Sequence, residues 1–316
     1  MKRLPVRKNA FSVMRNVLLI AGTRYAPEQN GSNVPIIISH GFLSTRKNMA
    51  GYAKTLAKWG YTVYTFDFIG GAPKNDSDGT MTEMSVLTEK EDLIAVMNYV
   101  HRDGFNSKPI LVGFSQGGFV SAMVAAEHRN EVQKLILFYP ALCIPDDARR
   151  GRMQSFRFDP ANVPELISVP GRRMTIGSRY VLDAQPLDAY ACISAYHGDV
   201  LLLHGTSDRI VDISYSEKAC KSFSGRAGLY PIANAGHGFW GNSRKQAMAV
   251  VYQFLSGREE VLRVDVSLSE IRKVRNGISS TWTIPFTGSA IHDILFCEST
   301  ELQLRKLHVF DPFRRG

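Results

Sequence analysis

The sequence predicts an α/β fold built on a mostly parallel, doubly wound sheet. Short apolar runs of strand length alternate along the chain with segments of helical periodicity, which is the pattern of parallel strands joined by crossover helices. The chain has 316 residues, which suits one large domain of this class with a small appendix. Its 44% apolar and 21% charged residues are ordinary globular usage and exclude a disordered chain, a collagen-like repeat or a coiled coil.

The expected strands are short and apolar on both faces, as strands buried in a parallel sheet are. The runs that meet this description are residues 17–21, 34–39, 61–66, 109–112, 134–138, 200–203 and 229–232. Between them lie segments with apolar residues at helical spacing, such as Leu93, Val96 and Val100 in one of them. The helices predicted from this spacing cover residues 48–59, 86–100, 117–128, 214–222 and 246–255.

One interval between strands is too long for a simple crossover. Sixty residues, 140–199, separate the strand that ends near Tyr139 from the strand that begins at Val200, whereas a crossover takes a fraction of that length. The interval is rich in arginine, proline, glycine and methionine and has no strong periodicity. We expect a cap inserted at about residues 141–190 over the strand ends; an insertion without a role is the alternative.

The last sixty residues differ in character from the rest. Apolar and polar side chains alternate over residues 262–268 and 281–287, and Asn276-Gly277 between them is a favoured hairpin turn. Two or three strands bury little on their own, so this segment either docks on the main domain or forms a contact between subunits, as in a homodimer. The predicted organisation is an α/β domain at residues 1–257 and a short β-rich extension at residues 258–316.

A net charge of +9 raises the hypothesis of nucleic-acid binding. Five basic residues lie in the first fifteen positions, which we expect to form a terminal arm: Lys2, Arg3, Arg7, Lys8 and Arg15. A second cluster runs from Arg149 to Arg157, and no aromatic-and-basic nucleic-acid motif accompanies either cluster. We therefore expect no nucleic-acid partner and interpret the charge as favouring solubility and attracting anionic small molecules.

The sequence does not indicate a membrane, a disulfide framework or a metal. No stretch approaches the roughly 18 apolar residues of a membrane span, and no export signal precedes the first apolar run, so we expect a cytoplasmic protein. The four cysteines are scattered without a paired spacing and are expected to be reduced: Cys143, Cys192, Cys220 and Cys297. Zinc-protease, P-loop and dinucleotide motifs do not occur, so no cofactor is expected.

The strongest functional motif is Gly113-Phe-Ser-Gln-Gly117, which follows an apolar strand and precedes a helix of small residues. In this arrangement the serine occupies a sharp strand-to-helix turn with strained backbone angles, and the glycines let the helix pass close to the strand. Ser115 then presents its hydroxyl above the sheet edge, at the positive end of the following helix. We predict that Ser115 is a nucleophile.

A serine hydroxyl needs a base to remove its proton, and for a serine on such a turn the partners follow in the order carboxylate, then histidine. His237 lies in a glycine-flanked loop after residues 229–232 and is the predicted base. Asp208 follows the strand at 200–203 by a tight turn and is the predicted acid, which fixes the imidazole tautomer and stabilises the imidazolium. Asp212, four residues further on, is the rival for this role.

The tetrahedral intermediate of acyl transfer needs hydrogen-bond donors for its oxyanion. One expected donor is the backbone N–H of Gln116, the residue after the nucleophile. The second is expected from the loop after the strand at 34–39, where a His-Gly pair opens a tight turn and leaves the Phe42 N–H as the natural donor. His40 is interpreted as an organiser of this loop rather than as a base.

Together these motifs resemble the α/β-hydrolase superfamily over roughly residues 15–256. The stretches most similar to the bacterial cinnamoyl (feruloyl) esterases are His40–Phe42, Gly113–Gly117, Phe158–Pro160, His204–Asp208 and Gly236–Gly238. That family carries a small cap after its sixth strand, where this chain has its long interval, and polar cap residues of the family hold the phenolic hydroxyl of the substrate. The resemblance implies this role for Asp147, Gln154 and Tyr180, and it does not cover residues 258–316.

The sequence therefore predicts a serine carboxylesterase that hydrolyses hydroxycinnamate esters, such as those of ferulate, caffeate or p-coumarate, through an acyl-enzyme and without a cofactor. Its partner would be a small-molecule ester. A general or lipase-like esterase and an acylaminoacyl-peptidase-like hydrolase are the alternatives, although peptidases of that type carry an N-terminal propeller that fifteen leading residues cannot supply. The alternative outside enzymes is a hydrolase fold used as a binding module, because fold does not fix function.

Overall fold

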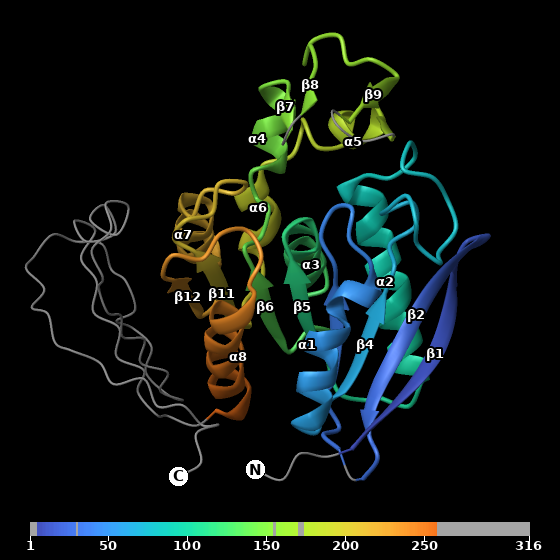
Figure 1. The fold of residues 1–316 in the computed structure, drawn as a ribbon, viewed down its shortest axis with the longest axis vertical. Helices are drawn as coiled ribbons and strands as arrows, with labels where there is room; N and C mark the ends of the chain where they lie inside the picture. The colour runs from blue at the N-terminus through green and yellow to red at the C-terminus, as the bar shows by residue number, and fades with distance from the viewer. Residues whose placement is uncertain (1–4, 30, 154–155, 170–173, 258–316) are drawn as a thin grey trace, which may run out of the picture. The chain divides into compact units, whose positions relative to one another are not determined.

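An eight-stranded mixed sheet forms the centre of the fold (Figure 1). The computed structural model describes residues 5–29, 31–153, 156–169 and 174–257, so the predicted extension at 258–316 lies outside the described residues. The strands stand in the order β1-β2-β4-β3-β5-β6-β11-β12. Their bounds are Val6–Arg15 (β1), Leu18–Pro27 (β2), Pro35–Ser39 (β3), Thr62–Phe66 (β4), Ile110–Phe114 (β5), Lys134–Phe138 (β6), Asp199–Gly205 (β11) and Ala227–Ile232 (β12).

The described residues fall into two compact units. The first contains the residues up to Leu202 together with Ile210–Leu229, and the second contains Leu203–Arg209 together with the residues from Tyr230 onward. The first unit holds the serine motif and the inserted segment. The second holds Asp208 and His237.

β3 lies at the point where the strand order reverses direction. It pairs in parallel with β4 on one side and with β5 on the other, and β5 pairs in parallel with β6. Every residue of β3, β4 and β5 is buried, which explains why these strands are mostly apolar on both faces. Ser39 stands opposite Gly113 at the carboxyl ends of β3 and β5, and ligands of open α/β sheets bind at such a switch point.

Helices cover both faces of this part of the sheet, as predicted for a doubly wound fold. α2 (Val86–Arg102) and α3 (Gln116–Glu127) pack side by side on one face, and α1 (Arg46–Lys58) covers the other (Figure 1). α7 (Ser214–Ser222) has the predicted bounds. The bounds of α1, α2 and α3 lie within two residues of the prediction, and α2 begins at the predicted residue.

The start of the last described helix differs more from the prediction. α8 (Gly241–Ser256) begins at residue 241 rather than at 246. The hydroxyl of Ser243 accepts a hydrogen bond from the Trp240 N–H and donates to the Trp240 carbonyl. These bonds close a first turn whose polar and glycine residues carry no apolar periodicity, so the pattern missed it.

The amino-terminal segment is a strand, and the prediction of a terminal arm is wrong for residues 6–15. β1 pairs antiparallel with β2 along its whole length. The two-residue turn between them holds Asn16 at φ 55°, a left-handed conformation that asparagine tolerates. β1 forms the edge of the sheet and most of its side chains are exposed, so it lacks the apolar run of a buried strand.

The long interval forms a packed inserted segment between β6 and β11. Its described elements are α4 (Ile144–Arg149), β7 (Arg152–Met153), β8 (Phe156–Arg157), β9 (Leu166–Ser168), β10 (Thr175–Gly177), α5 (Arg179–Leu182) and α6 (Ala189–Ser194). Met153, Phe156, Ile176 and Tyr180 are buried in the same apolar core as α3. α4, β7, β8, β9 and α5 lie beyond the carboxyl ends of β5 and β6 (Figure 1). The boundaries of a separate cap at 141–190 stay a prediction.

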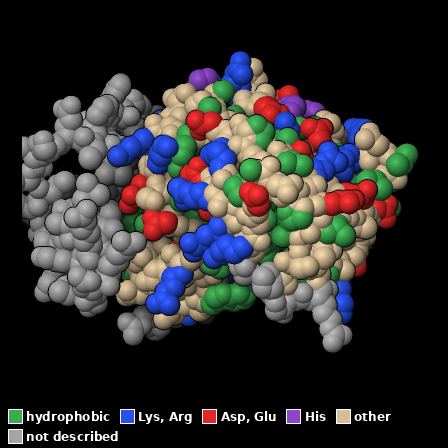
Figure 2. Space-filling view, turned by 90° about the horizontal axis from the view of Figure 1, so that it is seen from above, with side chains coloured by type: hydrophobic (Ala, Val, Ile, Leu, Met, Phe, Trp, Pro, Cys, Tyr) green, Lys and Arg blue, Asp and Glu red, His purple; other side chains and the backbone are tan. Residues whose placement is uncertain are grey.

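At least one basic side chain of the inserted segment, that of Arg149, is paired with groups of the same segment. Arg149 donates to Asp146 at 2.6 Å and to the carbonyls of Gln185 and Leu187 at 2.8 Å each. On the face seen in Figure 2, the Lys and Arg side chains stand among Asp and Glu side chains. The charge on this face is therefore mixed in sign.

Candidate active site

Ser115 sits in a strained turn between β5 and α3. Its backbone angles are φ 51° and ψ −119°, a region that residues with a side chain rarely adopt. A Cβ on Gly113 would lie 2.4 Å from the Gly117 carbonyl oxygen, and a Cβ on Gly117 would lie 2.2 Å from the His40 carbonyl oxygen. Only glycine fits at both positions, which is the local geometry that the motif predicted.

Backbone hydrogen bonds hold the turn in this conformation. The Ser115 N–H donates to the Phe138 carbonyl at 2.9 Å. The Ser115 carbonyl accepts from the N–H groups of Gly118 and Ala141, also at 2.9 Å each. The surrounding elements β6 and α3 therefore fix the position of the serine, and strain fixed in this way is typical of functional sites.

The loop after β3 passes directly beside Ser115. A Cβ on Gly41 would lie 3.0 Å from the Ser115 Cβ, so the backbone of this loop approaches the serine closely. The loop turns back at once, because the Ser44 N–H donates to the Gly41 carbonyl at 3.1 Å and Leu43 has a positive φ of 59°. Phe42, the predicted oxyanion donor, is the residue between Gly41 and this strained leucine.

His40 organises this loop. Its Nδ1 lies 2.8 Å from the Gly41 carbonyl oxygen, and its Nε2 accepts from the Phe68 N–H at 3.1 Å. Both contacts are satisfied by a neutral imidazole with its proton on Nδ1. Burial lowers the pKa of His40, which favours the neutral form. The side chain thus ties the loop after β3 to the loop after β4.

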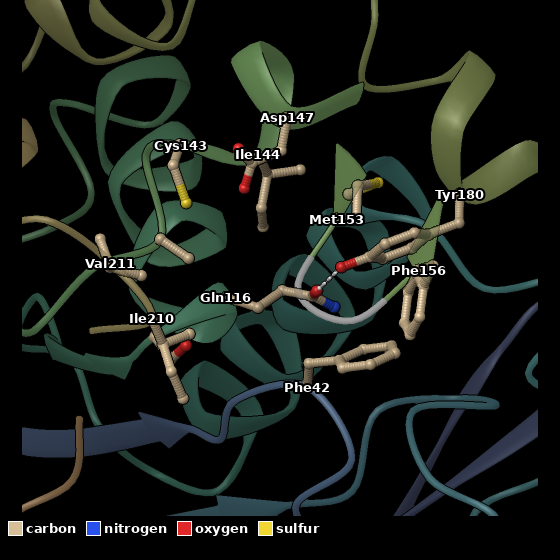
Figure 3. Close-up of a pocket in the computed structure, with 12 residues that line it drawn as sticks. Phe42, Gln116, Cys143, Ile144, Asp147, Met153, Phe156, Tyr180, Ile210 and Val211 are labelled. Atoms are coloured by element: carbon tan, nitrogen blue, oxygen red, sulfur yellow. Dashed lines mark hydrogen bonds between the residues drawn. The ribbon is translucent and has the colours of Figure 1, made fainter. Parts of the chain in front are cut away.

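A pocket of about 390 Å³, counting the space open to solvent, lies beside Ser115 in the first unit (Figure 3). The predicted site residues on its wall are Phe42, Ser115, Gln116, Asp147 and Tyr180. The structure therefore brings the serine, both predicted oxyanion residues and two predicted cap residues around one cavity. Gln154 lies outside the described residues.

Other residues of the pocket wall were not predicted from the sequence. They are Ala141, Cys143, Ile144, Met153, Phe156, Ile210 and Val211. Most of them come from the inserted segment, whose short elements have no periodicity that would mark one face. Ile210 and Val211 lie two and three residues after Asp208 in the chain, and their position close after a site residue was the available signal.

The Gln116 side chain connects the pocket to the inserted segment. The Tyr180 hydroxyl donates to the Gln116 Oε1 at 2.5 Å (Figure 3). The Gln116 amide contacts the Met84 sulfur at 3.7 Å. Tyr180 is buried, and burial raises its pKa well above the usual value, with the nearby carboxyl of Glu89 adding to this effect. Tyr180 is therefore a neutral phenol at any working pH.

Glu89 on α2 is a buried carboxyl beside Gln116. Neither of its oxygens has a well-formed hydrogen bond among the described residues. Burial raises the pKa of Glu89 well above its usual value; the Gln116 amide opposes this rise and the charge of Asp92 adds to it. Sequence reasoning missed Glu89, because a single glutamate in the first turn of a helix normally marks an N-terminus facing solvent.

Asp147 brings a second carboxyl with an altered pKa, this one on the pocket wall. It lies on α4 and is partly buried. Burial raises its pKa, while a hydrogen bond from Cys143 and the charge of Arg150 oppose the rise. Asp147 can accept a hydrogen bond from a ligand, and a fraction of it holds a proton at a higher pH than a free aspartate does.

In the second unit, Asp208 and His237 form a hydrogen-bonded pair. The His237 Nδ1 lies 2.8 Å from the Asp208 Oδ2. The Asp208 side chain is fully buried, whereas that of His237 is 15% exposed. A buried carboxylate that holds Nδ1 fixes the tautomer that leaves Nε2 available for proton transfer. The predicted rival, Asp212, instead accepts from the Ser214 N–H at the start of α7.

The loops that carry this pair are joined by backbone contacts. The Ser207 N–H donates to the Ala235 carbonyl, and the Asn234 N–H donates to the Thr206 hydroxyl, each at 2.9 Å. A Cβ on Gly205 would lie 2.2 Å from the Ala235 carbonyl oxygen, so glycine is required for this approach. These contacts give Asp208 and His237 a fixed separation.

The described residues offer no obvious metal or membrane site. Within them, no group of three His, Cys, Asp or Glu side chains could hold a metal ion. No helix of the described part of the chain has the length and apolar character needed to cross a bilayer. Cys143, Cys192 and Cys220 are not joined in disulfides.

Comparisons with known proteins concern the fold of the chain. A family model described as serine aminopeptidase, S33, matches residues 33–181. A solved structure with ferulic acid bound, Est1E from Butyrivibrio proteoclasticus, is similar with a TM-score of 0.71 and 25% sequence identity, covering 78% of this chain and 98% of that chain. Mouse alpha/beta hydrolase domain-containing protein 10 is similar with a TM-score of 0.59 and 18% identity, covering 78% of this chain and 99% of that chain. A search of curated proteins found no match.

The fold and these matches place the chain in the α/β-hydrolase superfamily, as the sequence motifs predicted. Its class is that of the serine hydrolases with this fold. Of the two solved structures named above, Est1E has the higher TM-score and the higher sequence identity to this chain.

Proposed function

We propose that this chain is a carboxylesterase that hydrolyses esters of hydroxycinnamic acids. The observation that carries the proposal is the pocket beside Ser115, whose wall is mostly apolar and aromatic, with polar groups from Asp147, Tyr180 and Gln116. A flat aromatic acyl group with a hydroxyl at its far end matches such a lining. The ferulic acid held by Est1E supports this class of substrate.

In the proposed reaction, Ser115 is the nucleophile. Its Oγ attacks the ester carbonyl carbon while its proton passes to Nε2 of His237, and Asp208 stabilises the resulting imidazolium. The oxyanion accepts hydrogen bonds from the Phe42 and Gln116 backbone N–H groups. The imidazolium returns its proton to the leaving alcohol. Water then attacks the acyl-enzyme, gives a proton to His237, and releases the acid as Ser115 regains its own.

In the proposed complex, polar groups of the inserted segment bind the phenolic hydroxyl. The Tyr180 proton is directed at Gln116, so the Tyr180 oxygen is placed to accept a hydrogen bond rather than to donate one. Asp147 is also an acceptor when ionised. The Tyr180 oxygen and the Asp147 carboxylate are both acceptors, which suits a phenolic hydroxyl that donates a hydrogen bond. Gln154 stays a predicted contact to the same hydroxyl.

The main test compares substrates. We expect kcat/KM for methyl ferulate to exceed that for p-nitrophenyl butyrate, with Ser115→Ala as the blank. Loss of a triad serine lowers turnover by about 10⁴-fold or more in related systems. Retained activity in Ser115→Ala would reject the assigned nucleophile. Good butyrate turnover with poor ferulate turnover would keep the hydrolase and reject the phenol pocket.

A pair of neighbouring aspartates gives a matched test of the pocket. Asp147 lies on the pocket wall, whereas the adjacent Asp146 interacts with Arg149 and accepts from the Tyr215 hydroxyl. We expect Asp147→Asn to lower kcat/KM for methyl ferulate about tenfold, as loss of a hydrogen bond to a charged group does, and to spare p-nitrophenyl butyrate. Asp146→Asn should leave both substrates unchanged. Equal losses on both substrates in Asp147→Asn would remove Asp147 from recognition.

A second candidate function follows from the matched family model, which is described as serine aminopeptidase. A pocket carboxylate such as Asp147 could pair with the α-amino group of a peptide. An aminoacyl-β-naphthylamide tests this reading in the same assay, and turnover of it above that of methyl ferulate would favour the peptidase.

A binding module without catalysis is separated from both enzymes by labelling. A fluorophosphonate reacts covalently only with an activated serine. We expect wild-type protein to label and Ser115→Ala not to label. Wild-type protein that does not label would favour the binding module.

A further inference from the structure

Asp208 lies between two histidines. Its Oδ2, which is 2.8 Å from His237 Nδ1, is also 3.3 Å from the Nε2 of His204. The side chains of Asp208 and His204 are both fully buried. All three residues belong to the second compact unit, so this arrangement lies within one unit.

The chain geometry explains how His204 reaches the carboxylate. His204 is near the carboxyl end of β11, and Asp208 follows four residues later. The Asp208 N–H donates to the Gly205 carbonyl at 3.2 Å, which closes a tight turn and brings the aspartate back over the strand end. Gly205 and its contacts with the loop before His237 hold the turn in place.

The chemistry of a buried carboxylate gives His204 a task. An ionised carboxyl removed from water is costly unless donors compensate its charge. A carboxylate oxygen has two lone pairs and can accept two N–H groups. A neutral His204 with its proton on Nε2 supplies the second of these beside the one from His237. With both, the Asp208 side chain is held from two directions and cannot rotate away from the base.

We propose that His204 is a positioning residue whose Nε2–H holds the Asp208 carboxylate in the orientation that aligns His237. The inference rests on the proposed function only in taking His237 as the base of the serine. His204 touches neither the substrate nor the serine in this account, and acts through Asp208 alone.

The test uses the full chain and two replacements of one residue. His204→Leu fills similar space and removes the donor, whereas His204→Gln keeps an N–H at a similar reach. We expect His204→Leu to lower kcat about 10- to 100-fold with KM nearly unchanged, by analogy with the loss of an outer hydrogen-bond partner that orients a metal-binding histidine or carboxylate. His204→Gln should recover most of the activity. His128→Leu, at the distant end of α3, is the matched control and should leave activity unchanged.

Two further readouts separate positioning from packing. The rate of fluorophosphonate labelling at Ser115 should fall in His204→Leu by the same factor as kcat, and recover in His204→Gln. The low-field proton resonance of the His237 Nδ1–H should shift or broaden in His204→Leu and return in His204→Gln. Wild-type kcat, labelling and resonance in a folded His204→Leu would overturn the inference. Equal losses in both variants, in step with a lower melting temperature, would also overturn it and leave a packing role.

The outcome for His204 is separable from that for the substrate. If wild-type protein labels but does not hydrolyse ferulate esters, the proposed substrate fails, while the labelling rates of the two variants still decide the role of His204. If wild-type protein hydrolyses ferulate and His204→Leu does so equally well, the proposed function stands and this inference fails.

Discussion

Replacing Gly117 with alanine should damage activity far more than stability. A Cβ at this position would lie 2.2 Å from the His40 carbonyl oxygen and 2.6 Å from that of Ser39, where ordinary contact begins at 3.4 Å. The two backbones must therefore separate by about 1.2 Å. Because both atoms belong to the main chain, no side-chain rotation relieves the clash, and the loop that carries Phe42 moves away from Ser115.

The two consequences differ in size. A misplacement of about 1 Å in a catalytic arrangement costs about 100-fold in rate. Overpacking costs about 1–3 kcal/mol in stability, and alanine at a helical position returns about 0.8–1 kcal/mol relative to glycine. The expected result is a loss of about 100-fold in kcat/KM with a fall in melting temperature of only a few degrees.

Gly118→Ala is the matched control. Gly118 is also in the first turn of α3, so it gains the same helix propensity, but its Cβ would meet Pro140 at 3.0 Å, which a shift of a few tenths of an ångström relieves. We expect Gly118→Ala to keep kcat/KM for p-nitrophenyl butyrate within about threefold of wild type, because it leaves the loop after β3 in place. If Gly117→Ala matches Gly118→Ala in both kcat/KM and melting temperature, the reasoning about the loop and its donor is refuted.

Three other changes test the electrostatics. Tyr180→Phe should lower kcat/KM for methyl ferulate about tenfold more than for p-nitrophenyl butyrate; equal losses would contradict the phenol contact. Because the pKa of Glu89 is raised in the folded protein, the stabilisation that Glu89 contributes is fully present below the pKa of an unfolded glutamate and is lost as pH rises. The melting temperature of Glu89→Gln should therefore increase relative to that of wild type between pH 5 and pH 9. A constant difference would argue against a buried carboxyl. Arg15→Met should cost about 3 kcal/mol, because it leaves Asp92 buried without its ion pair; thermal unfolding beside the exposed-site control Arg7→Met measures this, and equal melting temperatures would contradict it.

The parallel strands could be predicted because burial on both faces leaves an unbroken apolar run. β3, β5 and β6 therefore match the predicted runs within one or two residues. β1 could not be found this way, because an edge strand with exposed side chains has no such run. Its available signal was Asn16, whose tolerance of a left-handed conformation permits a two-residue hairpin turn.

Local motifs and chain order predicted more of the site than periodicity did. Ser115 depends on a strand-to-helix turn that requires glycines at fixed spacing, so five residues describe it. The pairing of Asp208 with His237 depends on the order of the last two strands, which the chain also reveals. Much of the pocket wall comes from two-residue strands and short helices of the inserted segment, whose positions are set by tertiary packing. A homodimer, a cytoplasmic location and the role of residues 258–316 stay predictions.

Gln116 links the two parts of the proposed mechanism. Its backbone N–H is the proposed oxyanion donor, while its side chain accepts from Tyr180 and lies beside Met84 and Glu89 of the α2 region. The Tyr180 hydrogen bond therefore joins the residue that carries the proposed donor to the inserted segment. A change at Asp147 should then act mainly on KM for hydroxycinnamates. A change at Tyr180 should lower kcat as well, even for an acyl group without a phenol, because it releases the residue that carries the oxyanion donor.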